Sequence, residues 1–453
     1  EAVWLRTGIR NIPPAGPIPW HPEERSEVPL GRMPQAIAVI GAGVAGCALV
    51  AQLRRLGVQA PISLWETGRG PGGRASTRRF RDDPQAQLDH GAPLFNLAVQ
   101  PAPALLEPLL AGGWIGPFQG DLALLEGENR LELGKPDGYA RGQLLGGKGG
   151  MDQLCRGLLE LAQSAGAALG ATAVDTHFGT LVRHLNKPAK GAWQLLDQEG
   201  NLLGQADWLV FSSTLLAHPR SQAVFGWPEV PLKAAAASLA DWQLDHALTT
   251  IAGIRVEART NGLFVLPAAW VEPWLALPFR LLNFDAAAQQ RWGLARIAIQ
   301  PLADGRCAVV AHSSHAFAAD HLDVYGSHSA VAKLLQLPPD EGKEEQVIAA
   351  LVSAVVQALE PWLGDPALWQ ARLSSLNRHE RQMMRWAAAF PVAPGLPSEL
   401  TLCPISQVAF CGDYVAGVGF GRVEGALRSA ESLASQLQQV LTDAAPAPRR
   451  AGA

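Results

Sequence analysis

The sequence predicts an α/β protein with two parts: a domain with a parallel sheet built on a βαβ unit, and a second, α+β domain with an antiparallel sheet. Two apolar runs flank a glycine-rich turn and a helical pattern within residues 36–66. Another strand-like run and an amphipathic helical pattern lie near the other end, at 408–413 and 422–441. At 453 residues the chain exceeds one ordinary domain, so we expect two domains or one large domain with a lobe.

The N-terminal elements follow from their residue patterns. "AIAVI" (36–40) is uninterruptedly apolar, as expected for a parallel strand buried on both faces. "VAGCALVAQLRRLG" is a helix closed by Gly57, and "ISLWE" (62–66) is a second strand. Strand, turn, helix and strand within about 30 residues form a βαβ unit.

The middle of the chain gives fewer elements, and no internal repeat is visible. We expect a helix at 149–166, a hairpin and a buried strand within 193–213, a strand at 306–314 and a helix at 344–359. Residues 1–34 hold seven prolines and predict an irregular lead-in, and 441–453 predict a disordered tail.

Composition excludes several classes of function. Hydrophobic residues make up 48% and charged residues 17%, which is typical of a compact globular protein. The net charge is −4 and no long Lys/Arg cluster is present, so nucleic acid is not expected as a partner. Neither a transmembrane segment nor a signal peptide is expected. Five scattered cysteines without C-x-x-C spacing argue against a disulfide framework and a metal site, and for a reducing, cytoplasmic location.

The glycine-rich turn reads G-x-G-x-x-G, with Gly41, Gly43 and Gly46 at the glycine positions and Ala45 inside the motif. Alone it is weak evidence, because ligand-free glycine loops between buried elements are common. Its context supports a Rossmann-like dinucleotide site, since Gly43 lets the backbone approach a pyrophosphate and the helix directs free N–H groups toward it. Glu66 ends the second strand twenty residues after Gly46, where a carboxylate can accept ribose hydroxyls.

A second glycine-rich turn follows at once, with Gly72, Gly73 and Arg74. A plain NAD site does not need another phosphate contact there. The combination resembles FAD-binding proteins of the glutathione reductase fold, in their amine oxidase branch. "QLDHGAPLFN" (87–96) is similar to the stretch that follows G-G-R in that branch.

The C-terminal segment "FCGDYVAGVGFGRVEGALRSAESLA" (410–434) resembles the flavin motif of the same branch. The resemblance implies that Gly412 and Asp413 contact the ribityl chain or pyrophosphate. It also implies that a helix beginning at Arg422, Val423 and Glu424 faces the flavin pyrimidine. A helix N-terminus carries roughly half a positive charge, which suits the negative charge of reduced flavin.

With "GGKGGMDQL" (146–154) and "VVAHSSHAFAADHL" (309–322), the chain looks like a renalase-like flavoprotein of the bacterial type, within the flavin-containing amine oxidase superfamily. This resemblance implies that Val174 offers backbone contacts to adenine. The FAD should be noncovalent, because no S-G-G-C-Y segment is present. The implied FAD domain comprises 35–95, 145–213 and 380–440, and the implied substrate domain comprises 96–144 and 214–379.

The chain departs from the family at the segment expected to enter the flavin face, "MMRWAAAFPV" (383–392). Ala387 and Ala388 stand where larger groups are usual, and Trp386 is retained. Trp386 and His90 are the candidate catalytic side chains, although a hydrogen-bonded, partly buried histidine is a more common role for His90 than a general base. His312 and His315 in "HSSHAF" fit a strand end better than a nucleophile or metal site.

These features predict an FAD-dependent oxidoreductase that takes a hydride from a small substrate to flavin N5, with reoxidation by oxygen to hydrogen peroxide. The resemblance suggests a dihydronicotinamide-type ring as donor. Three alternatives stay open: a flavin amine oxidase, a desaturase of the same superfamily, and a noncatalytic FAD-binding or escort protein. The oligomeric state stays open.

Overall fold

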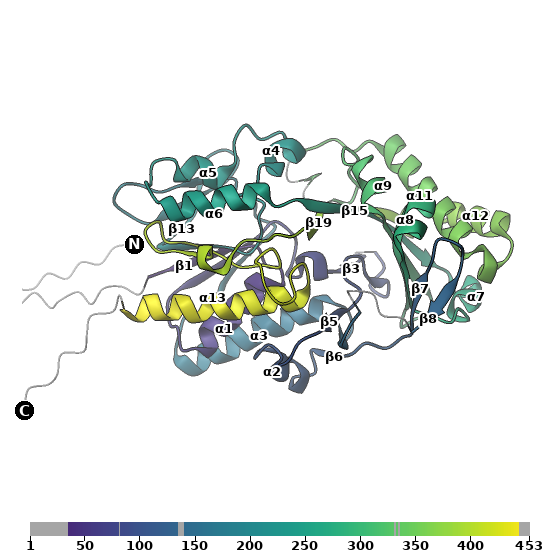
Figure 1. Ribbon diagram of the computed structural model, residues 1–453, viewed down its shortest axis with the longest axis horizontal. Helices are drawn as coiled ribbons and strands as arrows, with labels where there is room; N and C mark the ends of the chain where they lie inside the picture. Colours follow the sequence, from purple (N-terminus) through teal and green to yellow (C-terminus); the bar gives the residue numbers. More distant parts are fainter. Residues whose placement is uncertain (1–34, 81, 135–139, 330–331, 334–335, 444–453) are drawn as a thin grey trace, which may run out of the picture. The chain divides into compact units, whose positions relative to one another are not determined.

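The computed structural model describes residues 35–443 except 81, 135–139, 330–331 and 334–335. These described residues belong to one compact unit. The expected lead-in, 1–34, lies outside the described residues, and so does the expected tail beyond Asp443. Two sheets organise the described chain (Figure 1).

The first sheet has the strand order β10-β2-β1-β14-β21-β20, in which only β20 is antiparallel to its neighbour. The predicted βαβ unit is confirmed: β1 and β2 pair in parallel around the intervening helix α1. The bounds are β1 (Ile37–Ile40), α1 (Val44–Arg55), β2 (Ile62–Glu66), β10 (Asp175–Phe178), β14 (Trp208–Phe211), β20 (Leu402–Cys403) and β21 (Val408–Phe410).

Helices cover one face of this parallel sheet. α1 packs against α3 (Asp152–Leu169) and α13 (Val423–Asp443), and all three contribute to one apolar core (Figure 1). The other face packs on a three-stranded antiparallel sheet and two helices. These elements are β11 (His184–Asn186), β12 (Trp193–Leu196), β13 (Leu202–Ala206), α5 (Pro231–Ala236) and α6 (Trp242–Gly253).

The second sheet is mixed, with the order β19-β15-β18-β17-β16-β7-β8. Every neighbouring pair is antiparallel except β16 and β7. Its strands are β7 (Leu122–Leu125), β8 (Leu131–Leu133), β15 (Val256–Leu266), β16 (Leu281–Phe284), β17 (Leu294–Pro301), β18 (Cys307–Ser313) and β19 (Arg381–Pro391). The fold class predicted from the sequence is therefore confirmed.

Helices cover one face of the mixed sheet through a large apolar core. They are α7 (Glu272–Leu275), α8 (Ala286–Trp292), α11 (Glu341–Leu363) and α12 (Pro366–Ser375). The longest, α11, is long and apolar enough to span a membrane by length and composition alone, which the sequence analysis did not expect. Its side chains Leu351, Val352 and Val355 are fully buried in that core, as in a core helix of a globular protein.

Short elements join the two sheets. A hairpin of β3 (Thr77–Arg79) and β4 (Gln87–Asp89) follows the 3₁₀ turn η1 (Gly73–Ala75). A small sheet comprises β5 (Phe95–Leu97), β9 (Gln143–Gly147) and β6 (Ile115–Pro117). The remaining helices are α2 (Leu106–Ala111), α4 (Arg220–Phe225), η2 (Ala268–Trp270), α9 (His315–Ala319) and η3 (Ser398–Leu400).

The structure divides the chain differently from the expected domain ranges in three places. Leu105, Leu109 and Ile115 pack in the core of the parallel sheet, although 96–144 was expected in the second domain. The helices α5 and α6 also cover the parallel sheet. Conversely, β19 is the edge strand of the mixed sheet, although 380–391 was expected in the first domain. Each segment belongs to the sheet against which its apolar side chains are buried, and local sequence patterns do not show which sheet that is.

Candidate functional site

The first glycine-rich turn lies at the carboxyl end of β1. Gly41 has φ +104°, which favours glycine, and its N–H donates to the Trp65 carbonyl at 2.8 Å. A Cβ on Gly46 would lie 2.0 Å from the Gly41 carbonyl oxygen, so this glycine lets α1 pack against the turn. A Cβ on Gly43 would meet nothing within 4 Å, so the space beside Gly43 is open to a ligand.

The N-terminus of α1 begins at this open space. Gly43 is its N-cap residue and no side chain caps the helix, so its first N–H groups remain available. Ala45 is buried in the first turn, with its carbonyl 3.9 Å from the Cys411 Sγ. A helix of twelve residues with an uncapped N-terminus favours an anion at this position.

Glu66 lies beside the same turn. Its carboxylate accepts the N–H of Ala42 at 2.9 Å and that of Gly68 at 2.6 Å. Burial raises the pKa of Glu66, and the two N–H donors oppose that rise. One bond falls on each oxygen, so each keeps a lone pair for another donor such as a ribose hydroxyl.

The second glycine-rich turn touches the first. The Gly72 N–H donates to the Ala42 carbonyl at 2.9 Å, and a Cβ on Gly73 would lie 3.3 Å from the Gly43 Cα. Arg74 then reaches across to the C-terminal motif, where its guanidinium donates to both carboxylate oxygens of Asp413 at 2.7 and 2.6 Å. It also donates to the Ala389 carbonyl at 2.6 Å.

The C-terminal motif is held at the same edge of the sheet. The Gly412 N–H donates to the Ser429 hydroxyl of α13 at 2.9 Å, and the Asp413 carbonyl accepts the Gly421 N–H at 2.8 Å. Arg422 precedes α13, and its N–H donates to the Gly419 carbonyl at 2.9 Å. The structure thus brings Gly41, Gly43, Glu66, Gly72, Gly73, Arg74 and Asp413 to the carboxyl ends of the parallel strands. In open α/β sheets ligands bind at this edge.

The side chain of Glu424 does not take the expected position toward a ligand. It is fully buried, accepts the Ala98 N–H at 3.0 Å and pairs with Arg428 at 2.8 Å. Val423 packs partly against the α1 core. The first turn of α13 can therefore present only its backbone N–H groups, because both side chains are committed to packing.

Val174 also differs from expectation, since it precedes β10 at the amino end of that strand. The residue of β10 level with Glu66 is Phe178, four positions further on. The segment after β10 lies beside Glu66 instead: the Thr180 N–H donates to the Glu66 carbonyl at 3.0 Å, and that of Gly179 to the Gly68 carbonyl at 2.7 Å. Only the strand register, which the sequence does not give, distinguishes these positions.

The two candidate catalytic side chains, His90 and Trp386, are in contact. Their rings stack with centroids 5.5 Å apart and an interplanar angle of 10°. His90 Nε2 lies 3.1 Å from the Ser76 hydroxyl, and the His90 carbonyl accepts from Asn261 at 2.7 Å. Burial, with a contribution from Arg78, lowers the pKa of His90 to about 3, so the ring is neutral near pH 7 and a poor general base.

The face of the mixed sheet beneath His90 has a polar end that sequence reasoning missed. Asn261 pairs with His312, His312 with Arg296, and Arg296 with Asn283 across four neighbouring strands. His90 Nδ1, Asn261 Oδ1, His312 Nε2, Asn283 Nδ2 and Trp386 Nε1 are buried atoms without a hydrogen-bond partner among the described residues. Such a gathering of unsatisfied polar atoms is typical of a place that binds water or ligand.

His315, the other histidine of "HSSHAF", has a structural contact. It opens α9, and its Nδ1 accepts the Ala258 N–H at 3.0 Å. This contact joins α9 to β15.

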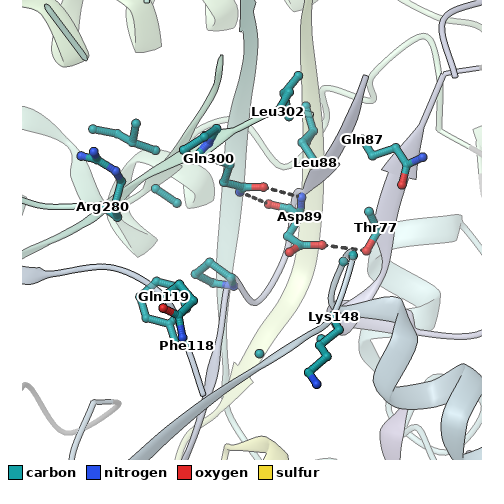
Figure 2. A pocket seen from close by; sticks show the side chains of 18 of the residues that line it. Thr77, Gln87, Leu88, Asp89, Phe118, Gln119, Lys148, Arg280, Gln300 and Leu302 are labelled. Carbon is teal, nitrogen blue, oxygen red and sulfur yellow. Dashed lines mark hydrogen bonds between the residues drawn. The ribbon is translucent and has the colours of Figure 1, made fainter. Parts of the chain in front are cut away.

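A cavity of about 740 Å³ lies next to this polar end (Figure 2). Leu281 and Ala298 line it, and each is two residues, or about 7 Å, from Asn283 and Arg296 along its strand. Asp89 lines it too, with its backbone held by both amide atoms of Gln300 and its carboxylate by Thr77 at 2.7 Å (Figure 2). Burial raises the Asp89 pKa to about 6.

Comparison with known proteins agrees with this geometry. Residues 39–109 match the family model described as an NAD(P)-binding Rossmann-like domain. No curated protein sequence matches the chain. Among solved structures, a protein assigned as a protoporphyrinogen oxidase from Exiguobacterium is similar over 90% of this chain and 99% of its own, with a TM-score of 0.56 and 12% identity.

Cyclohexylamine oxidase from Brevibacterium oxydans is similar over 90% of this chain and 99% of its own, with a TM-score of 0.53 and 12% identity. Putrescine oxidase bound to putrescine is similar over 89% of this chain and 99% of its own, with a TM-score of 0.51 and 13% identity. The chain shares the fold of these solved structures. Its two glycine turns and the Arg74–Asp413 pair lie together at the edge where a Rossmann-like fold binds a dinucleotide.

Proposed function

We propose that the chain is an FAD-dependent oxidoreductase acting on a small molecule. The observation that carries this proposal is the contact between the two glycine turns, with Arg74 joined to Asp413 at the carboxyl edge of the parallel sheet. A dinucleotide-binding fold that served only as scaffold would not need an open space at Gly43 or an uncapped helix beside it.

The residues would hold the cofactor in distinct ways. The Gly43 backbone and the first turn of α1 would receive the pyrophosphate, and Glu66 the adenosine ribose. Arg74, Asp413 and the first N–H groups of α13 would bind further along the cofactor, without a covalent bond. When bound, FAD supplies a hydride acceptor at N5 that oxygen can reoxidise, giving hydrogen peroxide.

The chain's own side chains would position the substrate and exclude water. Trp386 and His90 offer a stacked aromatic surface, and the polar end of the mixed sheet offers donors and acceptors. No proton transfer is assigned to His90, because its pKa of about 3 leaves it neutral at physiological pH.

The preferred donor is an uncharged reduced ring of the dihydronicotinamide type, as in renalase-like proteins. An observation favours it over an ammonium ion: Arg259 and Arg296 bring positive charge to the strands beneath His90, and Glu257 is paired with Arg259 at 2.8 Å. Asp89, the carboxylate at the neighbouring cavity, already accepts hydrogen bonds from the Thr77 hydroxyl and the Met151 N–H. An amine remains the second candidate, since two proteins of similar fold are named for oxidation of amines.

Anaerobic mixing tests both donors. The purified full chain, loaded with FAD, is mixed with dihydronicotinamide isomers and with simple amines, and flavin absorbance is followed. Bleaching by a dihydronicotinamide supports the proposal, and bleaching by an amine alone moves the function to amine oxidation. A yellow protein that no donor bleaches supports a noncatalytic FAD-binding role, and a protein that takes up no FAD refutes the proposal.

A further inference from the structure

Arg220 lies at the candidate cofactor site, although no glycine motif points to it. It begins α4, after the loop that leaves the carboxyl end of β14. Its N–H donates to the His218 Nδ1 at 2.9 Å, and the His218 Nε2 lies 2.8 Å from the Ile254 carbonyl oxygen. The loop that leads to α4 begins at the first glycine turn, because the Ser212 hydroxyl donates to the Gly41 carbonyl at 2.8 Å.

The guanidinium of Arg220 has an unsatisfied atom. Its Nη1 is buried and has no hydrogen-bond partner among the described residues. Burial and, after it, the charge of Arg74 lower the pKa of Arg220 to about 10, against the opposing effect of Asp413. The side chain therefore stays protonated at neutral pH, and its charge acts on the Arg74–Asp413 pair.

The carboxylate of Asp413 is already engaged. Arg74 occupies both of its oxygens, at 2.6 and 2.7 Å. Among the described residues no carboxylate forms an ion pair with Arg220, so its guanidinium adds positive charge in excess of the Arg74–Asp413 pair. A buried charge without a partner is costly, so this excess is expected where an anion binds.

A purely structural arginine in the same domain has different contacts. Arg54 is fully buried, and its guanidinium donates to three backbone carbonyls, those of Val58, Ala60 and Thr172, at 2.6, 2.9 and 3.0 Å, which leaves only its Nε without a partner among the described residues. Arg220 donates to no such group from its Nη1. The contrast indicates that Arg220 is reserved for a partner outside the chain.

We propose that Arg220 is a cofactor-binding residue that contacts an anionic part of FAD, either the pyrophosphate or the pyrimidine edge of the flavin. This inference rests on the proposed function, because it requires FAD at the glycine turns. It adds a second cation to the one supplied by Arg74.

The test compares Arg220→Gln and Arg220→Lys with the wild-type full chain. FAD is titrated into each cofactor-free protein and binding is followed by flavin fluorescence, with riboflavin as a probe that lacks the pyrophosphate. Arg220→Gln is expected to bind FAD at least tenfold more weakly, and Arg220→Lys to recover part of that loss. Weaker binding of FAD alone assigns the contact to the pyrophosphate, and weaker binding of both assigns it to the flavin ring.

Stability measurements separate this role from a structural one. Cofactor-free Arg220→Gln should melt no lower than wild type, because the change removes an unpaired buried charge. Arg54→Gln is the matched control and should lower the melting temperature without changing the FAD affinity of folded protein. Wild-type affinity in Arg220→Gln, or a loss explained by unfolding, overturns the inference. If the wild type itself binds no FAD, the proposed function fails instead.

Discussion

Gly43 and Gly46 stand three residues apart in one motif, yet the structure predicts opposite consequences for the same change to alanine. The Cβ of Gly43→Ala enters open space, with no atom within 4 Å. The Cβ of Gly46→Ala meets the Gly41 carbonyl oxygen at 2.0 Å and the Ser212 hydroxyl at 3.0 Å. The first change therefore tests the ligand's space and the second tests the packing of α1 on the turn.

The magnitudes follow from these contacts. Replacing glycine by alanine at a helix N-cap lowers the free energy of unfolding by about 0.5–1 kcal/mol. Alanine also restricts the unfolded chain, which raises the free energy of unfolding by about 0.4–1 kcal/mol. Because the two effects offset each other, Gly43→Ala should leave the stability of the cofactor-free protein nearly unchanged. Its methyl group would occupy the approach of the pyrophosphate and weaken FAD binding at least tenfold, or about 1.4 kcal/mol. Gly46→Ala forces a backbone shift and should destabilise the protein by about 1–3 kcal/mol.

Urea denaturation without cofactor and FAD titration of the folded protein measure the two effects separately. Gly57→Ala is unsuitable as a control because Gly57 has φ +85°, so Gly253→Ala serves, since its Cβ also meets nothing within 4 Å and it lies in α6, outside the motif. The reasoning is refuted if Gly43→Ala binds FAD as tightly as wild type, or if Gly46→Ala is as stable as wild type.

Three further predictions address other residues. Glu66→Ala should weaken FAD binding by two charge-assisted hydrogen bonds of roughly 1.5–3 kcal/mol each, and unchanged affinity in a titration would show that the ribose binds elsewhere. Glu424→Gln should lower the free energy of unfolding by about 1–3 kcal/mol in urea, since Glu424 is buried against Arg428, while a change confined to FAD affinity would contradict its packing role. His90 has a pKa of about 3 when folded against an ordinary 6.5, so the unfolded chain binds the extra proton and stability falls as the pH drops from about 6.5 toward 3. At pH 5 this costs about 2 kcal/mol, which His90→Gln should abolish in urea denaturation compared between pH 7 and pH 5; equal acid sensitivity of both proteins would disprove the burial argument.

Local patterns predicted the part of the fold that is local. The apolar run at 36–40 corresponds to β1 (Ile37–Ile40) and "ISLWE" to β2, because strands buried on both faces need continuous apolar residues. The long strand β15 was not predicted. Its sequence, "VEARTNGLFVL", mixes a polar end with an apolar end, and its partner β19 follows more than a hundred residues later.

The residues of the candidate site also differ in whether local sequence patterns predict them. Backbone-determined positions such as Gly43, Gly46 and Arg74 can be found from spacing, because the turn itself requires them. Arg220 and Asn261 owe their places to tertiary packing, and no spacing signals them. Glu424 shows the converse: it belongs to a recognisable motif, but its side chain is committed to Ala98 and Arg428.

The central claim is that the glycine turns and the Arg74–Asp413 pair bind FAD. The most direct measurement is an absorbance and fluorescence titration of FAD into the purified, cofactor-free full chain, followed by gel filtration. The account predicts a yellow protein that retains about one FAD per chain and releases it intact on denaturation. A protein that stays colourless, with FAD fluorescence unchanged throughout the titration, would contradict it.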